Sequence, residues 1–178
     1  DTADTAYNTT LTISSGLLTN AGVLNINAGA GGMRYFNASL SNNGTVNINN
    51  NLAVTKVDGV HVNNSDISIA GGTMTTVTGA GGTFTQAGGT LDIDGGFSMT
   101  GAGFSCTGGT LDIDGAGTFT LANMDFDYTG GTIQGMAVLN SVDLTIGPSG
   151  TSPAEFRMGA ASTLVGDVHV GQTVNILS

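Results

Sequence analysis

The sequence contains a single cysteine, Cys106, no tryptophan, and only three basic residues among 178. One thiol can form neither an internal disulfide nor a cysteine metal cluster. Three cations against 13 acidic residues give a net charge of −10, which argues against nucleic acid and anionic membrane partners. The two histidines, His61 and His169, are too far apart in the chain to suggest a shared site. We therefore predict that the chain is not an enzyme.

Helix-forming residues are also scarce, and no window shows a sustained apolar period of 3.6 residues. No apolar run approaches the roughly 18 residues that span a bilayer, so no membrane insertion is predicted. Glycine takes 30 positions, between regularly spaced aliphatic and phenylalanine residues. This pattern is too regular for a disordered linker. The composition therefore predicts an all-β chain.

The region from Phe84 to Gly135 repeats with a period of about 20 residues, which is typical of stacked-repeat proteins. Each repeat opens on a phenylalanine, continues with Gly-Gly-Thr, and then alternates apolar and polar residues, as in Leu91-Asp92-Ile93. A period of two is typical of a strand with one buried face. The glycines supply positive φ where the chain turns sharply.

Three columns of short strands recur in the repeats, which predicts a three-sided coil. The first column contains residues 18–20, 40–42, 62–64, 84–86, 104–106 and 126–128. Stacking would pair each strand with its equivalents about 4.8 Å above and below. The predicted fold is a parallel β-solenoid, and its irregular turns favour a right-handed β-helix of about seven coils. We predict one domain over residues 1–178, with regular coils across 11–146 and looser coils with a loop across 147–178.

This register predicts which side chains face the interior. One buried row should contain Leu18, Leu40, Val62, Phe84, Phe104 and Phe126. His61 should then point outward, whereas Cys106 should point inward as a small buried hydrophobe. The amides at the third position of the column would form either a hydrogen-bonded ladder or a row of solvated turn residues: Asn20, Asn42, Asn64 and Gln86.

The candidate site is a set of four aspartates in two adjacent repeats: Asp92, Asp94, Asp112 and Asp114. They should point outward, with Asp92 near Asp112 and Asp94 near Asp114, each pair roughly 5 Å apart at Cα. Ca²⁺ would relieve the repulsion between these carboxylates, and we predict no other cofactor. Two alternatives are a solubilising acidic stripe and the paired carboxylates of a glycoside hydrolase.

Three segments share a loose pattern of apolar-x-Asn/Gln-x-Gly followed by an apolar pair: LTNAGVLNI, LSNNGTVNI and FTQAGGTLDIDGGFSMT. Over roughly residues 16–138 this pattern resembles the repeats of filamentous haemagglutinin-type adhesins and autotransporter passenger domains. The resemblance implies a right-handed β-helix on a bacterial surface, acting in adhesion, biofilm formation or toxin display, with no catalytic residues. Cys106 and Tyr128 depart from the pattern at the amide position.

Together these features predict a structural or adhesive segment, a stiff shaft or spacer, of an extracellular or cell-surface protein. Threonine, asparagine and glycine richness with little lysine favours that location. The alternatives are a self-assembling filament subunit that stacks head-to-tail through uncapped coils, and a carbohydrate-active β-helix. The expected partners are copies of the chain, adjoining coils of a longer chain, surface glycans or host receptors.

Overall fold

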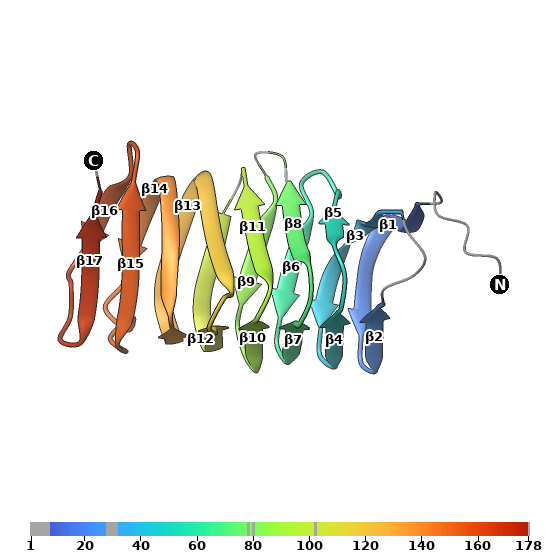
Figure 1. The fold of residues 1–178 in the computed structure, drawn as a ribbon, viewed down its shortest axis with the longest axis horizontal. Coiled ribbons are helices and arrows are strands. Elements are labelled where there is room, and N and C mark those ends of the chain that lie inside the picture. The colour runs from blue at the N-terminus through green and yellow to red at the C-terminus, as the bar shows by residue number, and fades with distance from the viewer. Residues whose placement is uncertain (1–7, 28–31, 78, 80, 102, 178) are drawn as a thin grey trace.

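The protein winds into a parallel β-solenoid of about eight turns, close to the seven predicted (Figure 1). The structure is a computed structural model that describes residues 8–27, 32–77, 79, 81–101 and 103–177. Residues 1–7 and 178 of the predicted single domain therefore lie outside the described part. Within that part all regular elements are strands, and no helix is long and apolar enough to cross a membrane.

The strands follow one another along the rod, with β1 and β17 at opposite ends (Figure 1). In chain order they are β1 (Thr9–Asn20), β2 (Val23–Ile26), β3 (Arg34–Asn42), β4 (Thr45–Ile48), β5 (Leu52–Val54), β6 (Val60–Asn63), β7 (Asp66–Ile69), β8 (Thr73–Val77), β9 (Thr83–Gln86), β10 (Thr90–Ile93), β11 (Gly96–Thr100), β12 (Gly103–Ile113), β13 (Thr118–Gln134), β14 (Met136–Ile146), β15 (Ala154–Gly159), β16 (Thr163–Gly166) and β17 (Gln172–Ile176). Every pairing between them is parallel and joins equivalent strands of successive turns, as the repeat predicted.

The pairing register defines three faces. The phenylalanine face carries one buried row in the order Leu40, His61, Phe84, Phe104, Phe126 and Leu144. The aspartate face pairs Val46, Ile67, Leu91, Leu111 and Ile133. The third face pairs Phe36, Val54, Thr76, Met99, Leu121 and Leu139. Long strands such as β13 bend around the corners and contribute to all three faces, so the three predicted columns are present.

The predicted register is wrong by one residue in the third turn. His61, and not Val62, occupies the phenylalanine row, and it is only 1% exposed. Val62 lies on the outer surface between Ser41 and Thr85. The prediction assumed a constant step of 22 residues and placed the apolar residue inside. The actual steps are 21 from Leu40 and 23 to Phe84, because the turn before β6 differs in length from its neighbours.

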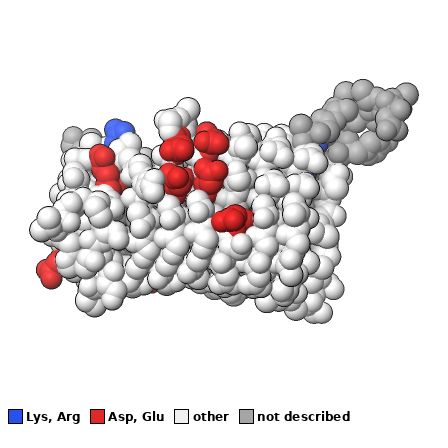
Figure 2. All heavy atoms as spheres, turned by 90° about the horizontal axis from the view of Figure 1, so that it is seen from below, with Lys and Arg blue, Asp and Glu red and all other residues white. Residues whose placement is uncertain are grey.

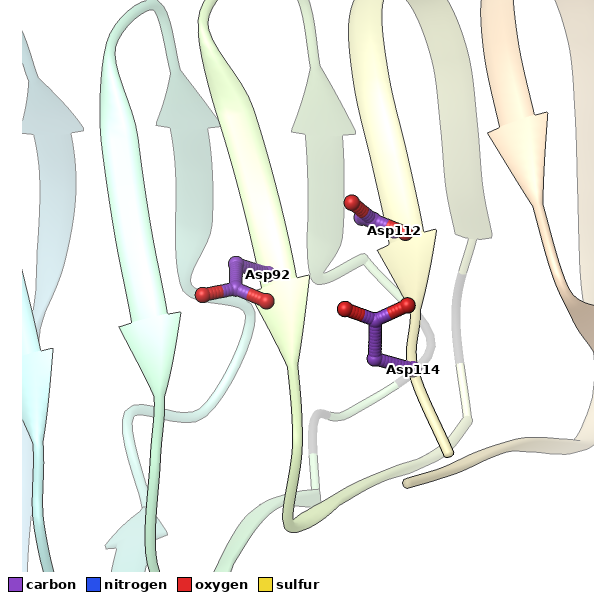
Figure 3. A group of neighbouring side chains, drawn as sticks. All are labelled: Asp92, Asp112 and Asp114. Carbon is purple, nitrogen blue, oxygen red and sulfur yellow. The ribbon is translucent and has the colours of Figure 1, made fainter. Parts of the chain in front are cut away.

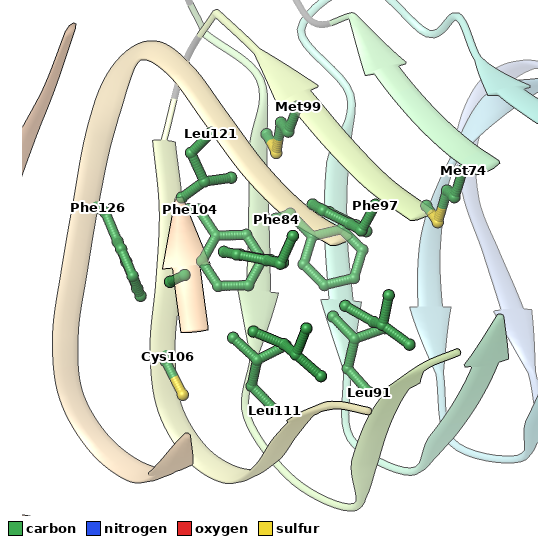
Figure 4. Packing of buried hydrophobic residues seen from close by; sticks show 14 of the residues in the cluster. Met74, Phe84, Leu91, Phe97, Met99, Phe104, Cys106, Leu111, Leu121 and Phe126 are labelled. Carbon is green, nitrogen blue, oxygen red and sulfur yellow. The ribbon is translucent and has the colours of Figure 1, made fainter. Parts of the chain in front are cut away.

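The core is continuous and becomes aromatic after the third turn. Phe84 stacks on Phe104 with centroids 5.5 Å apart and planes 4° apart, and Phe97 stacks on Phe119 at 5.2 Å (Figure 4). The two stacks meet edge-to-face at 5.1–5.8 Å. These four rings are at most 1% exposed. Cys106 is fully buried as predicted, and burial raises the pKa of its thiol to about 11.

An amide ladder runs beside the phenylalanine row, and the sequence predicted all but one of its members. Each side-chain amide donates to the next amide oxygen at 2.8 Å, in the order Asn20, Asn42, Asn63 and Gln86. Asn63 therefore takes the place predicted for Asn64, which donates instead to Asn43 on the surface at 3.0 Å. The last amide, on Gln86, donates to the Gly88 carbonyl at 2.8 Å.

The repeated Gly-Gly-Thr turns let the backbones of successive coils approach closely. Gly109 has φ +67°, and a Cβ there would lie 2.4 Å from the Gly89 carbonyl oxygen. Gly89 has φ +57°, and its Cβ would lie 2.2 Å from the Ser65 carbonyl oxygen. Any side chain would both strain the turn and collide with the coil below. These glycines thus fix the turn that precedes each strand of the aspartate face.

Candidate functional site

The structure brings three of the four predicted aspartates into one acidic cluster: Asp92, Asp112 and Asp114 (Figure 3). One carboxylate oxygen from each lies within 4.8 Å of those of the other two. Asp92 and Asp112 are direct partners in the pairing of β10 with β12, as predicted. Asp94 lies outside this triplet. Figure 2 shows that acidic side chains gather on one side of the rod, with basic side chains distant from them.

The alternation of the strands places these carboxylates on the outside. Leu91, Ile93 and Leu111 are fully buried, so the aspartate between Leu91 and Ile93 must face away from the core. The same outer row begins with amides, where Asn47 donates to Asn25 at 2.8 Å. One turn before the cluster, the Ser68 hydroxyl donates to Asp92 at 3.2 Å. The row thus changes from paired amides to unneutralised carboxylates at the fourth repeat.

Asp112 is the central carboxylate of the cluster. Its Oδ1 atom is buried and has no hydrogen-bond partner. Burial, followed by repulsion from Asp114, Asp92 and Asp94, raises the pKa of Asp112. A raised pKa in the folded state means that ionisation disfavours folding. The associated stability is therefore complete at acidic pH and is lost as the pH rises through the folded-state pKa. The ionised cluster weakens the protein at neutral pH unless a proton or a cation neutralises it.

The cluster offers ligands suited to Ca²⁺. Ca²⁺ takes six to eight oxygen ligands at 2.3–2.6 Å, and three carboxylates can provide three to six of them. Their exposed position leaves water to complete the coordination. Glycoside hydrolysis needs carboxylates that face a sugar-binding cleft. A hollow of about 290 Å³ beyond Gly115 is lined by residues such as Gly117, Met136 and Val138, and its lining contains none of the aspartates.

The calcium hypothesis makes a prediction that separates it from the acidic-stripe alternative. Millimolar Ca²⁺ should raise the melting temperature, because a ligand that binds only the folded state stabilises it. Asp112→Asn should abolish this rise. Without metal, Asp112→Asn should itself raise the melting temperature by up to about 2–4 °C, since opposed like charges cost roughly 0.2–1 kcal/mol. Scanning fluorimetry with Ca²⁺, Mg²⁺ or chelator measures both effects.

The control is Asp167→Asn, which removes one charge from the exposed turn after β16. This variant should keep the full response to Ca²⁺. A wild-type melting temperature that does not change with Ca²⁺ would contradict the metal site and leave the acidic stripe.

Sequence analysis missed a second acidic group and the environment of His61. On the phenylalanine face, Asp125 pairs with Asp143, and Asp127 follows two residues later on the same side. The Thr163 hydroxyl donates to the Asp143 carboxylate. The column spacing already contained this juxtaposition. For His61 the only available indication was the continuity of the amide ladder through Asn63, which places residue 61 inside.

Comparison with known proteins adds no family to this description. No family model, no curated protein and no solved structure matches the chain. The resemblance to haemagglutinin-type adhesins and autotransporter passenger domains therefore stays a prediction.

Proposed function

We propose that the chain is a structural segment, a stiff shaft or spacer, of an extracellular or cell-surface protein. The observation that carries this proposal is the uninterrupted stacking of equivalent strands around one core, from Phe36 at the first turns to Phe156 near the last. Each turn advances the rod by about 4.8 Å, so about eight turns span roughly 38 Å. Side chains fill the interior throughout, which makes the rod resist bending.

Two further features support a structural role. The acidic cluster lies on an outer face and lines none of the described hollows, which suits solubility or cation binding better than catalysis. The surface is rich in threonine, asparagine and glycine and poor in lysine, which favours an extracellular location. An adhesive function would place recognition on the outer rows of the rod, with the stacked core as its support.

A shaft should tolerate changes in the number of its turns. Deletion of residues 84–103 joins Thr83 to Phe104, and these positions are equivalent because Thr83 pairs with Gly103 and Phe84 with Phe104. The shortened chain should fold with the same cross-section, and duplication of the same 20 residues should also fold. Stability in solenoids is approximately a sum over neighbouring repeats, so each change adds or removes one unit. Small-angle X-ray scattering should show lengths that differ from the parent by about 5 Å.

The matched control is deletion of residues 94–103, which removes half a turn. It would join a strand of the aspartate face to one of the phenylalanine face and should prevent folding. A full-turn deletion that unfolds the protein as severely as the half-turn deletion would contradict the shaft proposal.

A second candidate is a filament subunit, and the unpaired edges at the two ends favour it. Within the described residues β1 and β2 pair only with later strands, and β16 and β17 only with earlier ones. Val165 and Ile176 at one end are 57% and 84% exposed, and Val23 at the other is 64% exposed. Head-to-tail stacking would pair these edges, and light scattering should show growth with concentration. Val174→Pro should block it, and a parent chain that stays monomeric at high concentration would contradict it.

A further inference from the structure

His61 is a buried histidine in a row that is otherwise apolar. It lies between Leu40 and Phe84 in the pairing register and is 1% exposed. Its ring is 6.5 Å from that of Phe36 and 6.3 Å from that of Phe84, stacked on the latter at 26°. The Nε2 atom is buried and has no hydrogen-bond partner. A Cβ at Gly59 would lie 2.8 Å from this atom, so the turn before β6 closes tightly over the imidazole.

No described group is placed to neutralise a charge on this imidazole. The small hollow beside His61 is otherwise lined by apolar side chains such as Ile48, Ile67 and Met74. A water there would find one polar side chain, fewer than the two to four partners that buried water needs. On the elements packed around it, the ionisable groups are engaged elsewhere or lie on the surface.

Those groups can be followed one by one. Lys56, in the turn before β6, donates to the Ile13 and Ser14 carbonyls of the first turn. The Asp58 carboxylate accepts from the Gly81 amide at 3.0 Å, and on β7 the Asp66 carboxylate accepts from the Thr90 amide at 3.1 Å. On β3, the half-buried Arg34 and Tyr35 lie at the hollow of the first turns rather than at the His61 ring, and neither is among the causes of its pKa shift.

The position of His61 divides the rod into two parts with different cores. The aromatic stacks begin at Phe84 and continue through Phe97, Phe104 and Phe119. Before His61 the core is mainly aliphatic, with Phe36 as its buried aromatic ring among the described residues. In a solenoid each turn contacts only its neighbours, so a weakened turn uncouples the parts on either side.

We propose that His61 makes the third turn an acid-sensitive break point, whose protonation opens the N-terminal turns while the phenylalanine-rich turns remain folded. Burial supports this, because it lowers the pKa of His61 from 6.5 to about 4. A lowered folded-state pKa means that the unfolded chain takes up the proton first. The stability contributed by neutral His61 is therefore complete above pH 6.5 and is lost as the pH falls toward 4. Between pH 7 and pH 5 the folded-to-unfolded ratio of this region should fall about 20-fold.

Hydrogen exchange measured by mass spectrometry on the full chain tests the proposal at pH 7 and pH 5, after correction for intrinsic exchange rates. Peptides that cover β3 to β6 should lose protection about 20-fold at pH 5, whereas peptides that cover β12 to β14 should keep theirs. His61→Leu restores the residue type found at Leu18 and Leu40, and it should remove this pH dependence. His169→Gln, which removes the other histidine, should behave as the wild type.

His61→Gln provides a second variant that is polar but does not titrate between these pH values. It should be less stable than the wild type at both pH values by the same factor. The proposal is overturned if His61→Leu and the wild type lose protection equally at pH 5. It is also overturned if β12 to β14 lose protection as early as β3 to β6.

Discussion

Phe104→Ala should lower the free energy of unfolding by about 3–5 kcal/mol, the largest effect that we expect from one substitution. The Phe104 ring is fully buried and contacts four other rings, with centroids between 5.1 and 5.8 Å away. Alanine would remove both aromatic stacks' central contact and leave a cavity that neighbouring turns cannot fill. The melting temperature should fall by about 6–20 °C in a chain of this size.

The matched control for this prediction is Val62→Ala. A constant repeat of 22 residues would place Val62 inside in the same row, whereas the structure places it on the outer surface. We expect its effect to remain within about 0.5 kcal/mol, as for other surface substitutions. Urea unfolding of both variants gives the comparison. Equal losses for Phe104→Ala and Val62→Ala would contradict the register.

Asn63→Ala should destabilise the protein by about 2–4 kcal/mol, because it interrupts the amide ladder at a buried position. Asn63 accepts from Asn42 and donates to Gln86, both at 2.8 Å, and it is fully buried. Alanine would leave the Gln86 oxygen without its donor and would remove one acceptor from Asn42. Buried polar groups without partners are more costly than the loss of an exposed hydrogen bond.

Asn64→Ala is the neighbouring control, because Asn64 makes an exposed bond to Asn43. Its effect should remain within about 0.5 kcal/mol. The same urea experiment decides between the two asparagines. If Asn64→Ala proved more damaging than Asn63→Ala, the ladder would run through the other residue and the third turn would need a different register.

The parts of the fold that could be predicted are those in which repeat spacing and hydrophobicity agree. Phe84, Phe104 and Phe126 recur with Gly-Gly-Thr at one offset, so both the buried row and its strand pairing follow from the sequence. The contact between Asp92 and Asp112 follows in the same way, because both lie between inward-facing aliphatic residues. Where spacing and side-chain chemistry agree, pairing is specified twice.

The third turn could not be predicted because spacing and hydrophobicity disagree there. A buried neutral histidine is less favourable than a buried valine, so side-chain chemistry alone places Val62 inside. The structure instead keeps Asn63 in the ladder, and satisfying three buried amides outweighs the gain from one buried valine. Asp94 left the cluster for another reason. β10 ends at Ile93, and the chain turns at Gly95, so Asp94 no longer follows the strand register.

The distance between two labelled outer positions tests the central claim, a rigid stack of equivalent turns, most directly. Ser41 and Thr145 belong to one outer row, five steps apart through Val62, Thr85, Ser105 and Asp127. Cysteines at both positions can carry spin labels, while the native Cys106 is fully buried. Double electron–electron resonance should give one narrow distribution centred near 24 Å between the labelled backbone positions, from five steps of about 4.8 Å. A broad distribution, or a centre displaced by several turns, would contradict the stiff solenoid.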